Sequence, residues 1–169
     1  MMKAIFLDLD GVLNTERYIV NAIENDMAVH DKYGHIFDDK CIEVLRNIIK
    51  ETDAKIIISS TWRYAGLEEM KNLWKDRNLP GEVIDVTLAK DSSRIKEQKR
   101  IFKELYGEDF YNRTRGQEID IYLKTHSEVN KYVIIDDDSD MLEDQNFVQV
   151  DAYNGLEEKH IENILKYLI

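Results

Sequence analysis

The chain has 169 residues, of which 43% are hydrophobic and 34% charged, and its formal net charge is −11. This length suffices for one domain with a hydrophobic core, and no apolar run approaches the roughly 20 residues of a membrane-spanning helix. The negative charge disfavours nonspecific binding to nucleic acid or to anionic membranes. The single cysteine, Cys41, allows no disulfide within the chain and favours a cytoplasmic location. The first apolar stretch is too short and too acidic for a signal peptide.

The first predicted strand, residues 3–8, ends in two acidic residues. Asp8 and Asp10 are separated by one residue and are followed by Gly11, which allows a sharp turn. Carboxylates this close repel each other unless a cation or a reaction needs them. An aspartate can attack a phosphoryl group, and a second acid two residues on can transfer protons. The alternative interpretation is a strand end with two solvated acids.

A second predicted strand, residues 55–59, ends in hydroxyl side chains. Three consecutive isoleucines indicate a strand covered on both faces, as in a parallel sheet. Ser59, Ser60 and Thr61 come at its end, and hydroxyl and backbone N–H groups at such a position are suited to hold phosphate oxygens. A common Ser/Thr helix start is the alternative. We expect Trp62 to serve in packing and Arg63 to lie at the surface.

The other predicted elements alternate between helices and strands. Residues 11–38 form a long loop or a small hairpin, as an insertion after the first strand. Residues 88–114 form a second, charged insertion that is helical around residues 94–106. The remaining elements are helices over residues 38–51, 65–78, 116–124 and 156–168, and strands over residues 82–87, 132–135 and 147–150.

This alternation predicts an α/β fold with an open, mainly parallel sheet of about five strands in one domain, residues 1–169. In such sheets the functional site lies beyond the carboxyl ends of the strands. The polar groups that follow three strands are therefore expected at one edge: Asp8 with Asp10, the hydroxyls from Ser59, and the run Asp136-Asp137-Asp138.

The late acidic run, together with Asp140, resembles the oxygen-rich set that Mg²⁺ prefers. One carboxylate of this run together with Asp8 would complete such a site. An acidic helix start, capped by Asp138 or Ser139, is the alternative interpretation. Phosphoryl chemistry also needs a cation. The candidates are Lys90, Arg94, Lys99, Arg113 and Arg115, and Arg115 is preferred because it directly precedes the helix that leads into the strand before Asp136.

These motifs together resemble the haloacid dehalogenase (HAD) superfamily. The stretch from Asp8 to Val12 resembles its first motif, Ser59 after the isoleucines its second, and the segment 133–137 its fourth. Arg115 is the best match to the third. The segments 59–63 and 115–119 also resemble small HAD domains associated with RNA-repair proteins. The resemblance implies a three-layer, Rossmann-like fold.

The resemblance also implies a role for each matching residue. Asp8 would be the nucleophile and a Mg²⁺ ligand, and Asp10 the general acid/base, with its main-chain carbonyl on the metal. Ser59, with Ser60 beside it, and Arg115 would bind the phosphoryl group. Asp136 would complete the metal site, with Asp137 as a ligand or close neighbour. The presence of Asp10 favours a phosphatase over a dehalogenase.

The insertions indicate little or no cap domain and therefore an open site. An open site fits a phosphorylated small molecule, a nucleotide or a nucleic-acid end. The predicted function is a Mg²⁺-dependent phosphatase that works through an aspartyl-phosphate. A non-catalytic binding or regulatory module and a phosphotransferase with the same intermediate are the alternatives.

Overall fold

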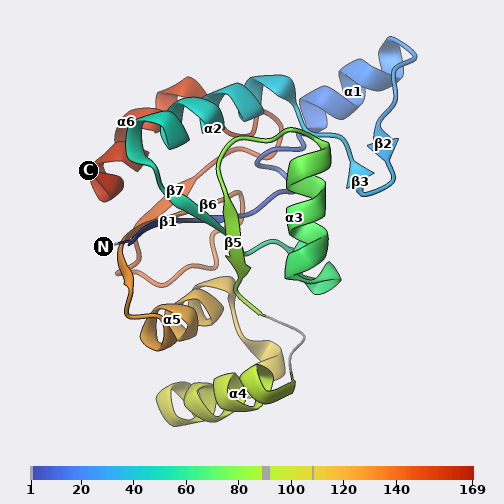
Figure 1. Cartoon of the computed structure of the whole chain (residues 1–169). Helices are drawn as coiled ribbons and strands as arrows, with labels where there is room; N and C mark the ends of the chain where they lie inside the picture. Colours follow the sequence, from blue (N-terminus) through green and yellow to red (C-terminus); the bar gives the residue numbers. More distant parts are fainter. Residues whose placement is uncertain (1, 89–91, 108) are drawn as a thin grey trace.

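A five-stranded parallel sheet forms the centre of the protein (Figure 1). The structure is a computed structural model that describes residues 2–88, 92–107 and 109–169. The strands lie in the order β5-β4-β1-β6-β7, and each neighbouring pair is parallel. They are β1 (Met2–Leu7), β4 (Lys55–Ile58), β5 (Val83–Val86), β6 (Val129–Asp136) and β7 (Phe147–Gln149). The predicted open parallel sheet of about five strands is therefore confirmed.

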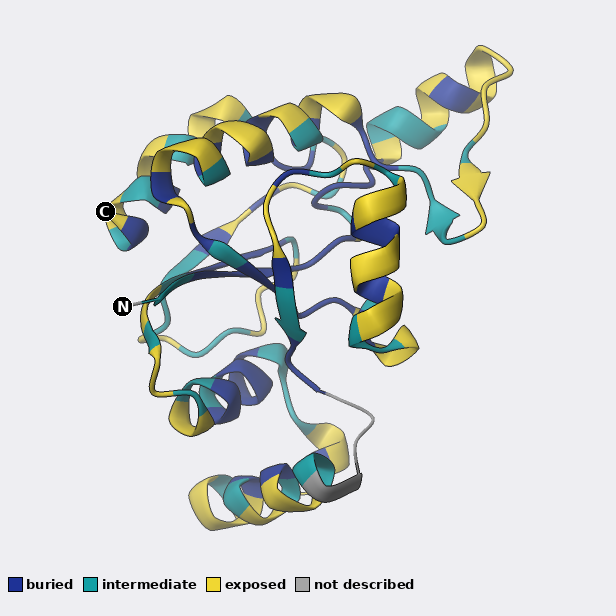
Figure 2. Ribbon diagram, in the orientation of Figure 1, coloured by how far each residue is buried: buried dark blue, intermediate teal, exposed yellow. Residues whose placement is uncertain are grey.

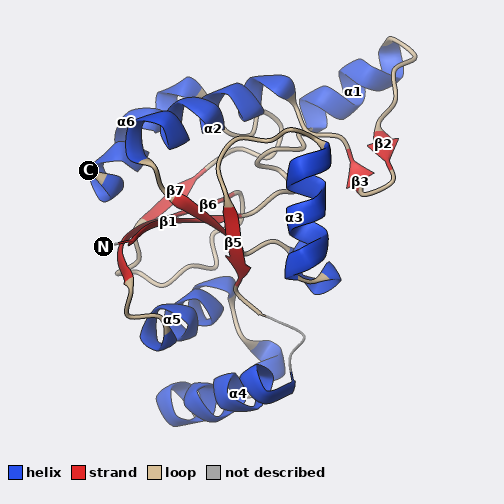
Figure 3. Ribbon diagram, viewed as in Figure 1, coloured by secondary structure: helices blue, strands red, loops and turns tan. Residues whose placement is uncertain are grey.

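Helices cover both faces of the sheet and make three layers (Figure 3). Side chains alternate along a strand, so neighbours face opposite ways. Leu7 packs in the larger hydrophobic core, whereas Phe6 packs against Tyr122 in a smaller one. The larger core is covered by α2 (Asp39–Thr52), α3 (Leu67–Asp76) and α6 (Ile161–Leu168), and the smaller by α5 (Arg115–Thr125). In the described ranges, no helix has both the length and the apolar character needed to cross a membrane.

The second insertion forms a helix whose apolar side chains pack on α5 and not on the sheet (Figure 2). Phe102 of α4 (Ser92–Tyr106) lies in a third apolar cluster with Phe110 and Ile121. The ring centroids of Phe102 and Phe110 are 5.6 Å apart. Phe110 begins the short 3₁₀ helix η2 (Phe110–Asn112). The helix predicted over residues 94–106 is thus present and begins two residues earlier.

The first insertion contains a helix that the sequence did not predict. The predicted small hairpin is present as β2 (His30–Asp31) and β3 (Gly34–His35), but α1 (Glu16–Glu24) precedes it. The Thr15 hydroxyl caps α1 by accepting a hydrogen bond from the backbone N–H of Tyr18 at 3.0 Å. The same hydroxyl donates to Asp38, and Arg17 forms an ion pair with Asp38 at 2.7 Å. Contacts with a distant residue therefore hold this short helix in place.

Three further predicted element starts differ from the structure by two or more residues. The helix predicted from residue 65 begins at residue 67, because the 3₁₀ helix η1 (Thr61–Ala65) precedes it. The last helix begins at residue 161 and not at residue 156, because the 3₁₀ helix η3 (Glu158–His160) comes first. β6 begins three residues before its predicted start.

Candidate functional site

The sheet brings the polar ends of three adjacent strands together. Asp8 follows β1, Ser59 follows β4 and Asp136 ends β6. Backbone bonds continue the pairing to this level, since Asp8 N donates to Ile135 O and Ser59 N to Leu7 O, each at 3.0 Å. Alternation along the strands directs all three side chains to the face that α5 covers. The convergence expected from the sequence is therefore present.

Three carboxylates form an acidic cluster at this edge: Asp8, Asp136 and Asp137 offer oxygens that lie within 4.8 Å of one another. Burial raises the pKa of Asp8 to about 6 and that of Asp136 to about 7. In both, the positive charge of Arg115 opposes the rise and the neighbouring carboxylates add to it. Oδ2 of Asp136 is buried and has no hydrogen-bond partner among the described residues. Such a set of crowded hard oxygens suits a divalent cation such as Mg²⁺.

Arg115 is the cation beside the acidic cluster. Its Nη2 lies 3.9 Å from Oδ1 of Asp8, and its Nε lies 3.9 Å from Oδ2 of Asp136. These distances are too long for hydrogen bonds, and Nη1 is buried with no partner in the described structure. Arg115 is the first residue of α5, and its backbone N–H donates to the Asp140 carboxylate at 2.9 Å. The guanidinium therefore keeps donors available for a further anionic group.

The two serines after β4 lie beside the nucleophile candidate. The Ser59 side chain is fully buried, and its hydroxyl has no hydrogen-bond partner in the described part of the chain. The Ser60 hydroxyl forms a hydrogen bond with Asp8 that lowers the pKa of Asp8. Ser60 also caps η1. The turn thus supplies one engaged hydroxyl and one free hydroxyl.

Asp10 lies outside the acidic cluster and is exposed. Its carboxylate accepts a hydrogen bond from Asn14 Nδ2 at 2.6 Å and from Trp62 Nε1 at 3.0 Å. Gly11 follows with a φ of +71°, and a Cβ there would lie 2.6 Å from Oδ2 of Asp137. Glycine therefore allows the turn and the close approach of the two acidic segments. A metal contact through the Asp10 main-chain carbonyl stays a prediction.

Residues 4–161 match the model of a protein family described as the HAD domain in Swiss Army Knife RNA repair proteins. The chain belongs to this family. The matched range contains every site residue described above, and the resemblance drawn from the sequence is confirmed. No curated protein and no solved structure matches the chain. Membership in the family supports hydrolase chemistry of the phosphatase type in general.

The other described candidate cations of this HAD domain contact partners outside the acidic cluster. Arg94 forms an ion pair with Asp85 at 2.7 Å, and Lys99 donates to the Tyr111 hydroxyl at 2.9 Å. Arg113 is paired with Glu118 at 3.0 Å. Lys90 lies outside the described residues. Of the described candidates, Arg115 is the one beside Asp8.

The prediction that Arg63 lies at the surface is wrong, because this residue is only 5% exposed. Its Nη1 donates to the carbonyls of Ser59 and Ser60 at 3.3 and 2.7 Å, and its Nη2 donates to Glu118 at 2.9 Å. Buried inside the HAD domain, Arg63 therefore stabilises the turn formed by Ser59 and Ser60. Glu118 follows Arg115 by one helical turn, a spacing that places both on one side of α5. That spacing was the available sequence signal for Glu118.

The alternative interpretation of the late acidic run as a helix start is wrong. Residues 137–146 form turns and irregular structure that lead from β6 to β7. Asp138 N donates to Oδ1 of Asp136 at 3.0 Å, which helps to fix that carboxylate. The Asp140 carboxylate accepts a hydrogen bond from Arg115 N at the start of α5. Residues of this run therefore have two roles. Asp136 and Asp137 belong to the acidic cluster, and Asp140 contacts the start of α5.

Proposed function

We propose that this HAD domain is a Mg²⁺-dependent phosphatase that hydrolyses a phosphomonoester through an aspartyl-phosphate on Asp8. The observation that carries the proposal is the acidic cluster with Arg115 beside it. Asp8, Asp136 and Asp137, with the main-chain carbonyl of Asp10, would hold the ion. Bound Mg²⁺ would neutralise charge on the phosphoryl oxygens.

The chain's own residues account for the two steps of this reaction. In the first step a carboxylate oxygen of Asp8 bonds to phosphorus, the bond to the leaving oxygen breaks, and Asp10 protonates that oxygen. In the second step water attacks phosphorus, Asp10 takes its proton, and the bond between Asp8 and phosphorus breaks. The free donors of Ser59 and Arg115 would bind phosphoryl oxygens throughout.

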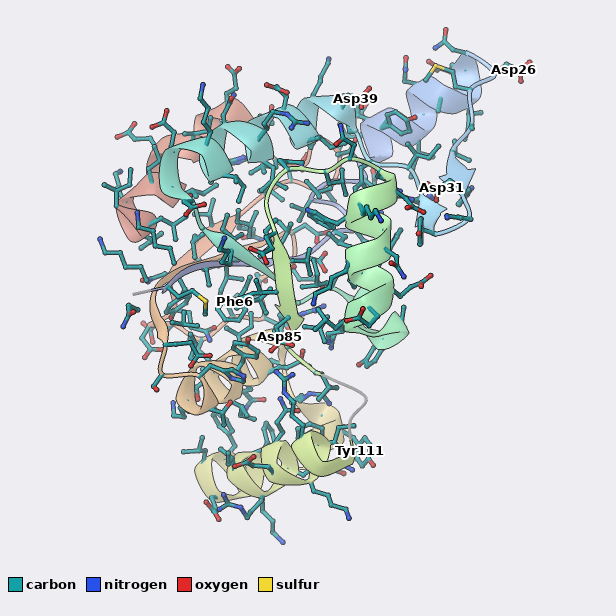
Figure 4. All side chains as sticks on the ribbon, viewed as in Figure 1. Phe6, Asp26, Asp31, Asp39, Asp85 and Tyr111 are labelled. Carbon is teal, nitrogen blue, oxygen red and sulfur yellow. The ribbon has the colours of Figure 1, made fainter. Side chains whose placement is uncertain are left out.

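For the substrate class we propose a nucleotide or a nucleic-acid end. The insertions around the site are small, and the matching family is named for RNA repair. Four cations of α4, at helical spacing i, i+3, i+4 and i+7, form what we call the α4 stripe: Lys96, Lys99, Arg100 and Lys103. Tyr111, labelled in Figure 4, is 75% exposed. The Nζ of Lys99 lies over its ring, 4.6 Å from the centroid. Cations with an exposed aromatic ring suit a single nucleic-acid strand.

A cytoplasmic location is part of the proposal. Cys41 is buried, and its thiol donates to the Asn154 carbonyl at 3.5 Å. Burial raises the pKa of this thiol to about 12, so it stays protonated and unreactive. A chain with one inert thiol suits a reducing compartment.

The test is phosphate release by the purified protein with Mg²⁺ from 4-nitrophenyl phosphate, nucleotides and oligonucleotides with 3′- or 5′-phosphates. We expect turnover by the wild-type protein and loss of at least about 100-fold in Asp8→Asn, which lacks a nucleophilic carboxylate. Absence of release from the whole panel would overturn the proposal. Phosphate transfer to an added alcohol instead of water would assign a phosphotransferase.

A further inference from the structure

The indole of Trp62 lies against the carboxylate of Asp10. We infer that Trp62 is a positioning residue that aims Asp10 at the leaving group; the inference rests on the proposed function. Nε1 of Trp62 is 3.0 Å from each carboxylate oxygen of Asp10. An indole N–H donates and does not accept. Trp62 can therefore fix the direction of the carboxylate without taking its proton.

The donors around Asp10 distinguish its two oxygens. Among the described residues, Oδ1 accepts from both Asn14 and Trp62, whereas Oδ2 accepts from Trp62 alone. Oδ2 therefore has the free lone pair and is the oxygen that carries the proton. In the first step this proton moves from Oδ2 to the leaving oxygen as its bond to phosphorus breaks. In the second step the attacking water returns a proton to Oδ2.

The surroundings of Trp62 make it a fixed donor. A Cβ at Gly34 would lie 2.9 Å from the indole, so hairpin β2–β3 touches the ring. The ring centroid is 5.7 Å from that of Phe37, and the Arg77 guanidinium lies 5.8 Å from the indole. Asp10 itself is exposed and directly precedes the turn at residues 11–13. A packed ring that donates to an exposed acid is the arrangement that orients a catalytic group.

Trp62→Phe removes the N–H and keeps an aromatic ring, so it isolates this contact. The readout is kcat/KM, which reports the first step, for two substrates that differ in leaving-group basicity. With phenyl phosphate, whose leaving oxygen needs a proton, we expect a loss of about tenfold. With 4-nitrophenyl phosphate, whose leaving group departs unprotonated, we expect less than about a twofold loss. Equal losses on both substrates would overturn the inference.

Two further variants separate positioning from general damage. Trp74→Phe is the matched control, because the indole N–H of Trp74 donates to the Pro80 carbonyl at 2.9 Å inside the larger core. We expect it to leave the ratio of the two substrates unchanged. In an Asp10→Asn background, Trp62→Phe should cost no additional activity, because it acts through Asp10. An equal loss in that background would contradict the inference.

A spectroscopic readout tests the contact even if the protein hydrolyses no phosphomonoester. The ¹H–¹⁵N spectrum should hold two indole signals, assigned by their loss in Trp62→Phe and Trp74→Phe. We expect Asp10→Ala to shift the Trp62 signal and to leave the Trp74 signal in place. An unmoved Trp62 signal would show that the contact is absent and would overturn the inference independently of the proposed function.

Discussion

The acidic cluster opposes folding in the metal-free protein. Asp136 has a pKa raised by burial from 3.8 to about 7, and the pKa of Asp8 is also raised. Below the unfolded pKa both states bind the proton, so the group has no effect on stability. As the pH rises toward the folded pKa, the unfolded state releases its proton first and is favoured. The metal-free protein should therefore lose stability between about pH 4 and pH 7.

Asp136→Asn should remove part of the stability loss that ionisation of the acidic cluster causes, because the amide carries no charge. In the presence of a chelator we expect the variant to exceed the wild type in free energy of unfolding by about 1 kcal/mol at pH 8. Near pH 4 the difference should disappear. Urea unfolding at both pH values measures it, and Asp138→Asn, at an exposed neighbour, is the matched control. A variant less stable than the wild type at pH 8 would contradict this account.

The sequence identified those site residues whose position follows from strand order alone. Asp8, Ser59 and Asp136 directly follow or end adjacent buried strands, so parallel pairing places them together. The contacts of Trp62 and Arg63 depend on partners 52 and 55 residues away. No local pattern specifies such partners, and the sequence therefore left the indole donor and the buried arginine out of the site.

At the scale of elements, the start of α5 controls the site because it carries Arg115. The loop 137–146 packs closely on its first turn at Gly116, whose carbonyl accepts from Gln145 Nε2 at 2.8 Å. A Cβ at Gly116 would lie 2.5 Å from Leu142 N and 2.7 Å from Met141 Cα. Both atoms belong to backbone, which does not yield as a flexible side chain does. Glycine is therefore required here for space.

Gly116→Ala tests this contact. We expect it to lower the free energy of unfolding, although helix propensity alone would predict an increase. Alanine in a free helix would stabilise by up to about 1 kcal/mol relative to glycine. We expect a net destabilisation of about 1–3 kcal/mol instead, because the added methyl group overpacks the loop. Activity at temperatures well below unfolding should fall as well, since Arg115 moves with the first turn. Thermal unfolding and kcat/KM measure both effects, and a more stable variant would refute the close packing.

The elements that the sequence predicted well are those with a long apolar pattern. The consecutive apolar residues of β1, β4 and β6 are buried on both faces. The helix α1 has nine residues, of which Ala22 alone is buried, and Ile23 is 67% exposed. Ile19, Ala22 and Ile23 recur at helical spacing, but this segment is shorter than the window of about 11 residues over which such a period can be recognised. The Thr15 cap and the contacts with Asp38 determine this helix, and the contacts depend on the fold.

At the scale of the whole molecule, the net charge of −11 and the proposed nucleic-acid end oppose each other. Charges are screened beyond about 8 Å at physiological ionic strength. Repulsion by the net charge therefore mainly slows the association of a nucleic acid with the protein. Contacts close to the site determine its affinity. The α4 stripe is such a contact, although Arg100 is partly neutralised by its ion pair with Glu104 at 2.8 Å. The lysines of the stripe carry most of its free positive charge.

Reversing two exposed charges of the α4 stripe tests its role in substrate binding. In Lys96→Glu/Lys103→Glu we expect kcat/KM to fall about tenfold for a phosphorylated oligonucleotide, through a higher KM, because phosphate contacts become repulsive. Turnover of 4-nitrophenyl phosphate, which carries no nucleic-acid strand, should stay unchanged. Lys50→Glu/Lys166→Glu is the matched control, since it alters net charge equally at exposed lysines on α2 and α6. Equal losses in both double variants would attribute the effect to overall charge, and the α4 stripe would then have no specific role.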